Sequence, residues 1–377
     1  MHFLDAGIRG FSRRACVAPG VVRSDVSPGR RVREDEAQSF TRRLAQAVLE
    51  GYSLRDARLE LLRHDFVQVF RVVSPGGEVL ALRLYRMPRA EPPRSDARAS
   101  TGFALRSPQT LRQQLAWLSA LRRETGLLVP EPVPAADGSL VGRVSVEGAP
   151  EVRHYALLRW VSGRHKGEDL TPADLSLVGS FMAWMHDHAE RHRAGEEDAL
   201  PRWDWHWPFG DSAPLWSAGE IFYSAEQIGV FEEVARSVWQ DLQELGYGRD
   251  VFGPIHRDLN LRNIVFQNGT VGAIDFDLCG LGHYLLDLVV TMTVTPLQPR
   301  REDDIERMRE ALLEGYRSER SLPENYRKYL KTFNAMRRVA VINRRIELLS
   351  SPATRHEARG GHRFLQNSLT WLRRNYL

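Results

Sequence analysis

Cysteine is almost absent from this 377-residue chain, which contains only Cys16 and Cys279. Two cysteines so far apart supply neither a disulfide framework nor a cysteine-ligated zinc site, and this scarcity is typical of proteins in a reducing compartment. The first residues include several arginines but no continuous apolar stretch, so a secretory signal is not expected. We therefore expect a cytoplasmic protein.

Long apolar runs and a strong charge imbalance are also missing. No stretch reaches the roughly 20 apolar residues that a membrane span needs, and the best candidate, YLLDLVVTMTV, is short and contains Asp287. The 52 Lys and Arg residues are nearly balanced by 48 acidic residues, for a formal net charge of +4. This pattern predicts neither a membrane nor a nucleic-acid partner, and it leaves the oligomeric state open.

The order of the expected elements divides the chain. Residues 1–39 are rich in Arg, Gly, Ser and Pro without sustained periodicity, so we expect a disordered extension there. Residues 40–160 are rich in strand patterns, whereas residues 161–377 are mainly helical, with a linker near residue 161. A chain of this length usually forms more than one core. We expect an α+β protein with a small β-rich N-terminal lobe and a larger, mostly helical C-terminal lobe.

A hairpin is predicted where VQVFRVV and EVLALRLYR flank the turn sequence SPGG. In its second strand Leu80, Leu82 and Leu84 alternate on one face, which places Arg83 on the opposite face. A second hairpin is expected within LVPEPVPAADGSLVGRV. Between the two, a helix is predicted to begin after Ser107, a side chain suited to capping, and to end at Gly126.

Two further stretches carry chemistry, HRDLNLRNIVF at residues 256–266 and AIDFD at residues 273–277. The apolar runs around QNGT predict a second short hairpin, which would bring Asn263 and Asp275 to the same end. These stretches match the protein-kinase patterns H-R-D-L-x-x-x-N and D-F-G. His, Asp and Asn also cap turns in many proteins, but turn capping does not predict the second acid at hairpin distance.

The chemistry that fits this pattern is phosphoryl transfer, which needs an aligned acceptor hydroxyl and metal ions that neutralise phosphate charge. Asp258 would accept or orient the hydroxyl proton. The amide oxygen of Asn263 and the carboxylate of Asp275 are hard oxygen ligands of the kind that Mg²⁺ prefers. Asp277 is an additional candidate for binding the metal or the substrate.

The stretches IHRDLNLRNIVF and GAIDFD, together with PRWDWHW and LLDL, resemble the aminoglycoside phosphotransferase and choline kinase-like superfamily over about residues 40–377. This resemblance implies a bilobal protein-kinase-like fold with the nucleotide between the lobes. It implies a kinase that uses Mg²⁺ and ATP or GTP to phosphorylate a hydroxyl of a small molecule. It also implies that His256 fixes the catalytic loop and that Asp287 binds the loop backbone.

Alignment with the kinase strand motif V-A-I-K places Ala81 against the adenine and Arg83 at the position of the phosphate-binding Lys. The acid expected on the following helix is replaced by Gln114, so an Arg–Gln contact would take the place of a Lys–Glu ion pair. Trp160 and Val161 fall at the interlobe hinge, where their backbone would meet the base. A solvated edge residue at Arg83 and a plain linker at the hinge are the alternatives.

Several kinase features are missing. No G-x-G-x-x-G precedes the strand, and only eleven residues separate Asp275 from Asp287, which leaves no room for an activation segment. Asn260 stands where Ser/Thr kinases usually carry Lys. These departures favour a small-molecule kinase and leave two alternatives, namely a nucleotide-binding or inert pseudokinase that acts through a protein partner, and a bacterial stress-type Ser/Thr kinase. The acceptor remains open.

Two other groups of residues attract attention. Trp203, Trp205 and Trp207 alternate in PRWDWHW; they could form an aromatic wall for the acceptor, although packing of the helical lobe is favoured. His188 and His192 are four residues apart on a predicted helix, a spacing that can bind a metal, although a solvated helix end is favoured.

Overall fold

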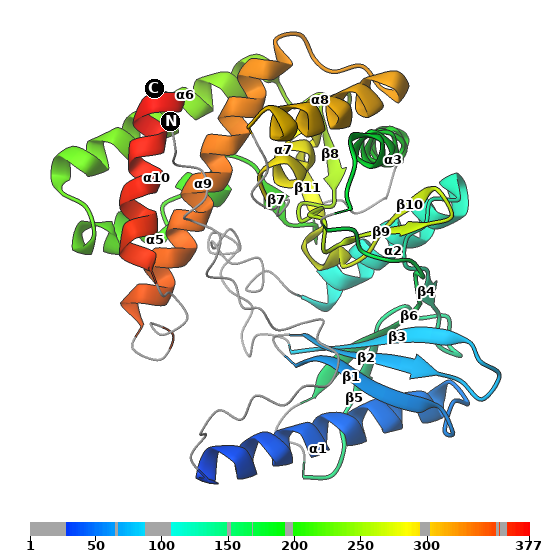
Figure 1. Ribbon diagram of the computed structural model, residues 1–377. Coiled ribbons are helices and arrows are strands. Elements are labelled where there is room, and N and C mark those ends of the chain that lie inside the picture. The colour runs from blue at the N-terminus through cyan, green and yellow to red at the C-terminus, as the bar shows by residue number, and fades with distance from the viewer. Residues whose placement is uncertain are drawn as a thin grey trace.

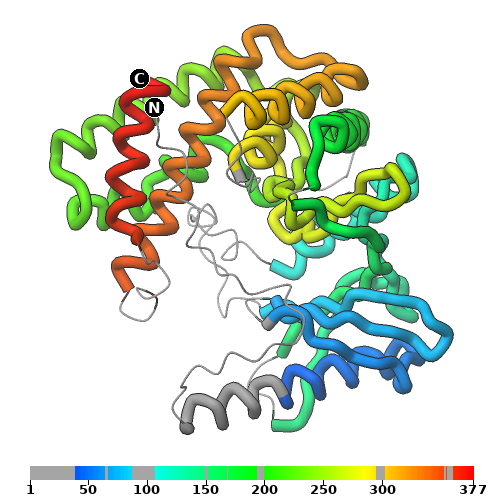
Figure 2. The backbone as a smooth tube through the Cα atoms, viewed as in Figure 1, coloured from blue at the N-terminus to red at the C-terminus, as the bar shows by residue number. Residues whose placement is uncertain are grey.

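The computed structural model describes residues 28–64, 67–86, 107–148, 152–167, 169–192, 199–294, 302–351, 354 and 360–377. A curved antiparallel sheet with one long helix beneath it forms the N-terminal part (Figure 1). A larger and mostly helical part lies above it, and Figure 2 traces the chain through both. The expected α+β arrangement is therefore confirmed.

The N-terminal sheet has the order β1-β2-β3-β6-β4, with β5 also paired to β6. The hairpin predicted around SPGG is present, and its strands pair from Val67↔Tyr85 to Val73↔Val79. The strands are β1 (Arg58–His64), β2 (Val67–Val73), β3 (Val79–Tyr85), β4 (Pro132–Val133), β5 (Gly142–Val144) and β6 (Arg153–Arg159).

The alternation along β3 separates a packed face from a polar one. Leu80, Leu82 and Leu84 are at most 2% exposed and share a hydrophobic cluster with Leu44 and Val48 of α1 (Pro28–Gly51). The opposite face looks toward the helical part. Arg83 of that face is consequently held between the two parts of the molecule.

Two expectations for this part need correction. The residues of the predicted second hairpin form β4 and β5, but the two strands pair with different residues of β6 instead of with each other. The expected disordered extension over residues 1–39 is helical from Pro28 onward, where α1 begins. Residues 1–27 lie outside the described residues.

The helix α2 (Pro108–Thr125) follows its predicted signals. The Ser107 side chain accepts a hydrogen bond from the Thr110 N–H, and Gly126 ends the helix in the left-handed conformation with a φ of 71°. Its buried face belongs to the same cluster as the core of the helical part. The helix thus lies between the sheet and the helical part (Figure 1).

The helical part also contains short strands that position the motif residues. A two-stranded hairpin joins β9 to β10, and a three-stranded sheet has the order β7-β11-β8. Among the described residues, no helix combines the length and the apolar character needed to cross a membrane. The elements are α3 (Pro172–Arg191), β7 (Arg202–Trp203), α4 (His206–Phe209), α5 (Pro214–Ala218), the 3₁₀ helix η2 (Gly219–Ile221), α6 (Ala225–Leu245), β8 (Phe252–Ile255), β9 (Ile264–Gln267), β10 (Thr270–Ala273), the 3₁₀ helix η3 (Phe276–Leu278), β11 (Gly280–His283), α7 (Tyr284–Val294), α8 (Glu302–Glu319), α9 (Tyr326–Ser350) and α10 (Gly361–Asn375).

Candidate active site

The loop that follows β8 is fixed by one buried carboxylate. Asp287, at the start of α7, is fully buried and accepts hydrogen bonds from the backbone N–H groups of His256 at 2.9 Å and Arg257 at 2.6 Å. Arg257 has a φ of 68°, a conformation that a non-glycine residue adopts only when its surroundings compensate. The expected backbone-binding role of Asp287 is confirmed.

His256 joins this loop to the second motif. The Asp258 N–H donates to His256 Nδ1 at 3.3 Å, so the opposite nitrogen, Nε2, carries the proton and donates to the Ile274 carbonyl at 3.1 Å. The ring also lies 4.3 Å from that of Phe276. His256 is fully buried and has the structural role expected from the sequence.

Two amide side chains hold Asp258. Asn263 Nδ2 donates to the Asp258 carbonyl at 2.8 Å and to its Oδ2 at 3.1 Å. Asn260 Nδ2 donates to the same carbonyl at 3.1 Å and to Oδ1 at 3.1 Å. The sequence identified Asn260 only as a departure from the Ser/Thr-kinase pattern. In the structure it is the second residue that orients Asp258.

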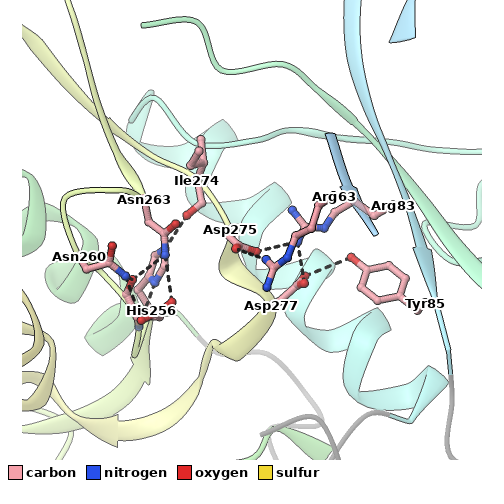
Figure 3. A network of polar contacts seen from close by, with 10 residues as sticks. Arg63, Arg83, Tyr85, His256, Asn260, Asn263, Ile274, Asp275 and Asp277 are labelled. Carbon is pink, nitrogen blue, oxygen red and sulfur yellow. Dashed lines mark hydrogen bonds and ion pairs between the residues drawn. The ribbon is translucent and has the colours of Figure 1, made fainter. Parts of the chain in front are cut away.

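The predicted hairpin brings the two motifs together. Strand β9 pairs with β10, and the Ile274 N–H donates to the Asn263 carbonyl at 2.8 Å. Asp275 follows with a φ of 67°, which turns the chain sharply out of the hairpin. Asn263 and Asp275 therefore lie at the same end, as the spacing predicted (Figure 3).

A cluster of opposite charges occupies the space between β3 and this turn (Figure 3). One nitrogen, Arg83 Nη2, lies 2.6 Å from Asp275 Oδ1 and 2.6 Å from Asp277 Oδ2. Arg63 Nη1 lies 3.2 Å from Asp275 Oδ2, and the Tyr85 hydroxyl donates to Asp277 at 3.3 Å. Arg83 is thus part of a polar site, which rules out a solvated edge residue.

Electrostatics within the cluster favour the charged forms. Burial alone would raise the pKa of Asp275, but the positive charges of Arg83 and Arg63 outweigh it and lower that pKa below its usual value. Burial alone would lower the pKa of Arg83, but Asp277 and Asp275 raise it well above its ordinary value. The carboxylate of Asp275 is therefore ionised at neutral pH.

The expected Arg83–Gln114 contact does not form. Gln114 Nε2 instead donates to the Cys279 carbonyl at 2.8 Å and, at 3.5 Å, to that of Asp277. Arg83 binds only acidic side chains among the described residues, since two carboxylates attract a guanidinium more strongly than a neutral amide does. Helix α2 is therefore tied to the segment after Asp275 through backbone carbonyls.

A cleft between the sheet and the helical part collects most of the predicted site residues. Ala81 and Arg83 line it from the sheet side, and Trp160 and Val161 line it from the segment that follows β6. The lining from the helical part includes Asn263, Ile274, Asp275, Phe276 and Asp277, whereas Asp258 lies behind Asn263 and is bonded to it.

Tryptophans of PRWDWHW pack inside the helical part, which is the arrangement that the sequence favoured over an aromatic wall for the acceptor. Trp203 and Trp207 are 1% and 3% exposed, and both rings contact the guanidinium of Arg257, at 4.4 and 4.5 Å. Burial lowers the pKa of Arg257 to about 10, although Asp258 opposes the decrease. Burial, together with the charge of Arg257, also lowers the pKa of Arg337 on α9 to about 10. The surroundings of Asp258 are therefore rich in positive charge.

Comparison with known proteins identifies the family that this geometry represents. The sequence profile of the Phosphotransferase enzyme family matches residues 58–329. The chain belongs to this family. Membership confirms the recognised superfamily and the expected enzyme class, a phosphotransferase with an alcohol group as acceptor.

Similar proteins have been described at both the sequence and the structure level. A Deinococcus radiodurans protein of uncharacterised function is 29% identical over 74% of this chain and 75% of its own length. A homoserine kinase from Sinorhizobium fredii is 29% identical over 53% of this chain, and the match spans only 56% of that enzyme.

Solved structures confirm the protein-kinase-like fold. A microcompartment-associated aminopropanol kinase has a TM-score of 0.69 at 27% identity, with 88% of this chain and 96% of that chain covered. An amicoumacin kinase in complex with AMP-PNP and Ca²⁺ has a TM-score of 0.68, with 86% of this chain and 93% of that chain covered. At 19% sequence identity, this similarity supports the fold alone.

Proposed function

We propose that the protein is a cytoplasmic, Mg²⁺-dependent kinase that transfers the γ-phosphoryl group of ATP or GTP to a hydroxyl of a small molecule. The observation that carries this proposal is the convergence of Asp258, Asn263 and Asp275 beside Arg83. Asp258 is bonded to Asn263, and Asp275 leaves the same end of the β9–β10 hairpin. Family membership supports the reaction class.

The donor atoms at this position suit Mg²⁺. Asn263 uses its Nδ2 on Asp258, so its Oδ1 is the amide atom left to bind a cation. Asp275 adds an ionised carboxylate. Oxygen ligands of this kind are those that Mg²⁺ prefers, and the bound ion would supply charge neutralisation to the phosphates.

The nucleotide base would lie against Ala81 and the hinge. The Trp160 N–H already donates to the Val79 carbonyl at 3.1 Å, whereas no described residue hydrogen-bonds the backbone of Val161. We therefore assign the hydrogen bonds to the base to Val161 and a covering role to Trp160, a residue that lines the cleft and is 37% exposed. Arg83 would contact a phosphate after leaving its carboxylates.

Asp258 is the residue assigned to the acceptor hydroxyl. Its carboxylate is held on one oxygen by Asn260 and on the other by Asn263, so it is oriented before any acceptor arrives. Positioned bases of this kind contribute about 10²- to 10⁴-fold to rates. The neighbouring guanidinium groups of Arg257 and Arg337 favour an acceptor that also carries an anionic group.

The first test is a thermal-shift titration with ATP and GTP, each with and without Mg²⁺. A ligand at about 100 times its Kd stabilises a protein by roughly 2.7 kcal/mol. We expect a metal-dependent shift in the wild type that is lost in Asp275→Asn and kept in Asp211→Asn, an exposed aspartate. A protein that binds neither nucleotide would contradict the kinase assignment and favour an inert pseudokinase.

The second test is an acceptor screen that includes amino alcohols, sugars and hydroxy acids, with homoserine among the acids because of the similar kinases. Asp258→Asn should lower kcat for the acceptor found by at least about 100-fold, with Asp211→Asn again as the control. Full activity in Asp258→Asn would remove Asp258 from the mechanism. Autophosphorylation on Ser or Thr without a small acceptor would favour the protein-kinase alternative.

A further inference from the structure

Three side chains with metal-binding chemistry meet where α2 and α3 end. Glu124 belongs to the last turn of α2, His188 to the last turn of α3, and His192 follows one turn later. One ligand atom from each lies within 4.8 Å of the others. Glu124 is ten residues beyond Gln114, roughly 15 Å along the helix, so this group is separate from the charged cluster of the cleft.

The helices place these groups face to face. The spacing of four residues puts both imidazoles on one side of α3, where their rings stack with centroids 5.1 Å apart. His188 Nε2 lies 3.0 Å from Glu124 Oε2. The other carboxylate oxygen of Glu124 accepts from Arg123 at 2.7 Å, which limits the directions in which the Glu124 carboxylate can turn.

The burial of His188 overturns the solvated helix end favoured from the sequence. His188 is only 3% exposed, and its Nδ1 is buried without a hydrogen-bond partner among the described residues. The nitrogen that faces Glu124 is the other one, Nε2, so Nε2 is the atom that would share a metal ion with this carboxylate. A metal ion at this place would therefore replace the hydrogen bond between His188 and Glu124.

We propose that Glu124, His188 and His192 form a binding site for Zn²⁺ or a similar transition metal, which joins α2 to α3. Two imidazoles and one carboxylate are a ligand set that holds Zn²⁺ and leaves the fourth position to water. Mg²⁺ prefers oxygen ligands and is not expected there. Zinc ligands in a tetrahedron lie about 3.3 Å apart, so the longest separation, which is at most 4.8 Å, must shorten by up to about 1.5 Å. Glu124, whose side chain is 45% exposed, has room to do so.

A metal at this position would reinforce the contact between the two parts of the molecule. Helix α2 lines the cleft with Leu111, Leu115 and Leu118, and its Gln114 binds the Cys279 carbonyl. Helix α3 packs closely against α8, and Gly179 of α3 lies against the α8 backbone. Zn²⁺ would therefore fix the helix that lines the cleft to the rigid helical part.

The test is calorimetric titration of the chelator-treated, full-length protein with ZnCl₂ in the absence of nucleotide. We expect the wild type to bind one Zn²⁺ per chain. The affinity for Zn²⁺ should fall at least tenfold in Glu124→Gln and in His192→Gln. Substitution of residues that only orient a metal ligand already lowers metal affinity by about 10- to 100-fold, and loss of a ligand should cost at least as much. His188 is left intact because its substitution would disturb a buried position.

Two control variants separate this site from other metal-binding groups. His362→Gln removes an exposed histidine on α10, and Asp275→Asn removes a carboxylate of the cleft. Both should bind Zn²⁺ like the wild type. Absence of binding in the wild type, full affinity in both ligand variants, or a loss in Asp275→Asn would each overturn the proposal. None of these results depends on kinase activity.

A thermal measurement gives an independent readout. Zn²⁺ should raise the melting temperature of the wild type more than that of His192→Gln at the same concentration, whereas Mg²⁺ should change the two melting temperatures equally. An equal rise with Zn²⁺ in both proteins would show that the stabilising ion binds elsewhere, and the assignment to α2 and α3 would be wrong.

Discussion

Replacing Arg83 by Gln should destabilise the protein in the absence of any ligand. Arg83 Nη2 lies 2.6 Å from both Asp275 and Asp277, and the three side chains are only 12%, 23% and 12% exposed. Without the guanidinium, two nearby carboxylates remain, with Arg63 as a half-exposed counter-charge. Removing one partner of a buried ion pair lowers the free energy of unfolding by about 3–5 kcal/mol. Because these side chains are partly exposed, we expect a loss of about 3 kcal/mol.

Two matched variants make this prediction specific. Because a single nitrogen of Arg83 contacts both carboxylates, a lysine ammonium can take its place, so Arg83→Lys should cost less than about 1.5 kcal/mol. Arg71→Gln removes an arginine from the neighbouring strand, where Arg71 lies 3.6 Å from exposed Glu60. A surface pair of this kind contributes at most about 1 kcal/mol.

The assay is urea unfolding followed by tryptophan fluorescence, repeated at decreasing pH. Because Arg83 lowers the pKa of Asp275, its contribution is complete above the unfolded value of 3.8 and is lost as the pH falls through the lower native value. The gap between wild type and Arg83→Gln should therefore narrow below pH 3.8. A stability loss below about 0.5 kcal/mol at pH 7, no greater than ordinary surface substitutions cause, would refute the reasoning.

Three further predictions concern stability and can be checked by chemical unfolding. Asp287→Asn should cost about 2 kcal/mol and lower kcat, because one of two backbone N–H groups loses its acceptor. Burial lowers the pKa of His283 from 6.5 to about 4, so stability should fall between those values, by about 2 kcal/mol at pH 5 from this residue; His283→Gln should flatten that slope. Gly315→Ala would place a Cβ 1.9 Å from the Ser176 carbonyl and should destabilise by more than about 2 kcal/mol, whereas Gly229→Ala at an exposed position of α6 should stabilise by about 1 kcal/mol.

Local patterns in the sequence predicted the parts of the site that depend on short-range geometry. The turn around QNGT was sufficient to place Asn263 and Asp275 at one end of a hairpin, as the β9–β10 pairing shows. The alternation of leucines along β3 correctly separated the packed face from the face of Arg83. Such features need only a strand period and a turn, both of which are local properties.

Contacts between distant segments could not be predicted in the same way. Nothing local indicates that β4 and β5 pair with β6, or that the Gln114 amide meets a carbonyl 165 residues away. The same holds for His188, which is buried and contacts Glu124 of another helix. A helical period shows which side of a helix is apolar but not which element covers it.

The partner of Gln114 leads to a final prediction about the missing kinase ion pair. In this chain Arg83 and α2 are both attached to residues 275–279, Arg83 through carboxylates and Gln114 through the Cys279 carbonyl. Gln114→Glu restores the acid of the kinase pattern, yet it would place a buried carboxylate against a carbonyl oxygen. We expect a loss of about 2 kcal/mol at pH 7 that shrinks at acidic pH, where the protonated Glu can donate. A variant as stable as the wild type at pH 7 would instead mean that Arg83 can turn from its aspartates to α2.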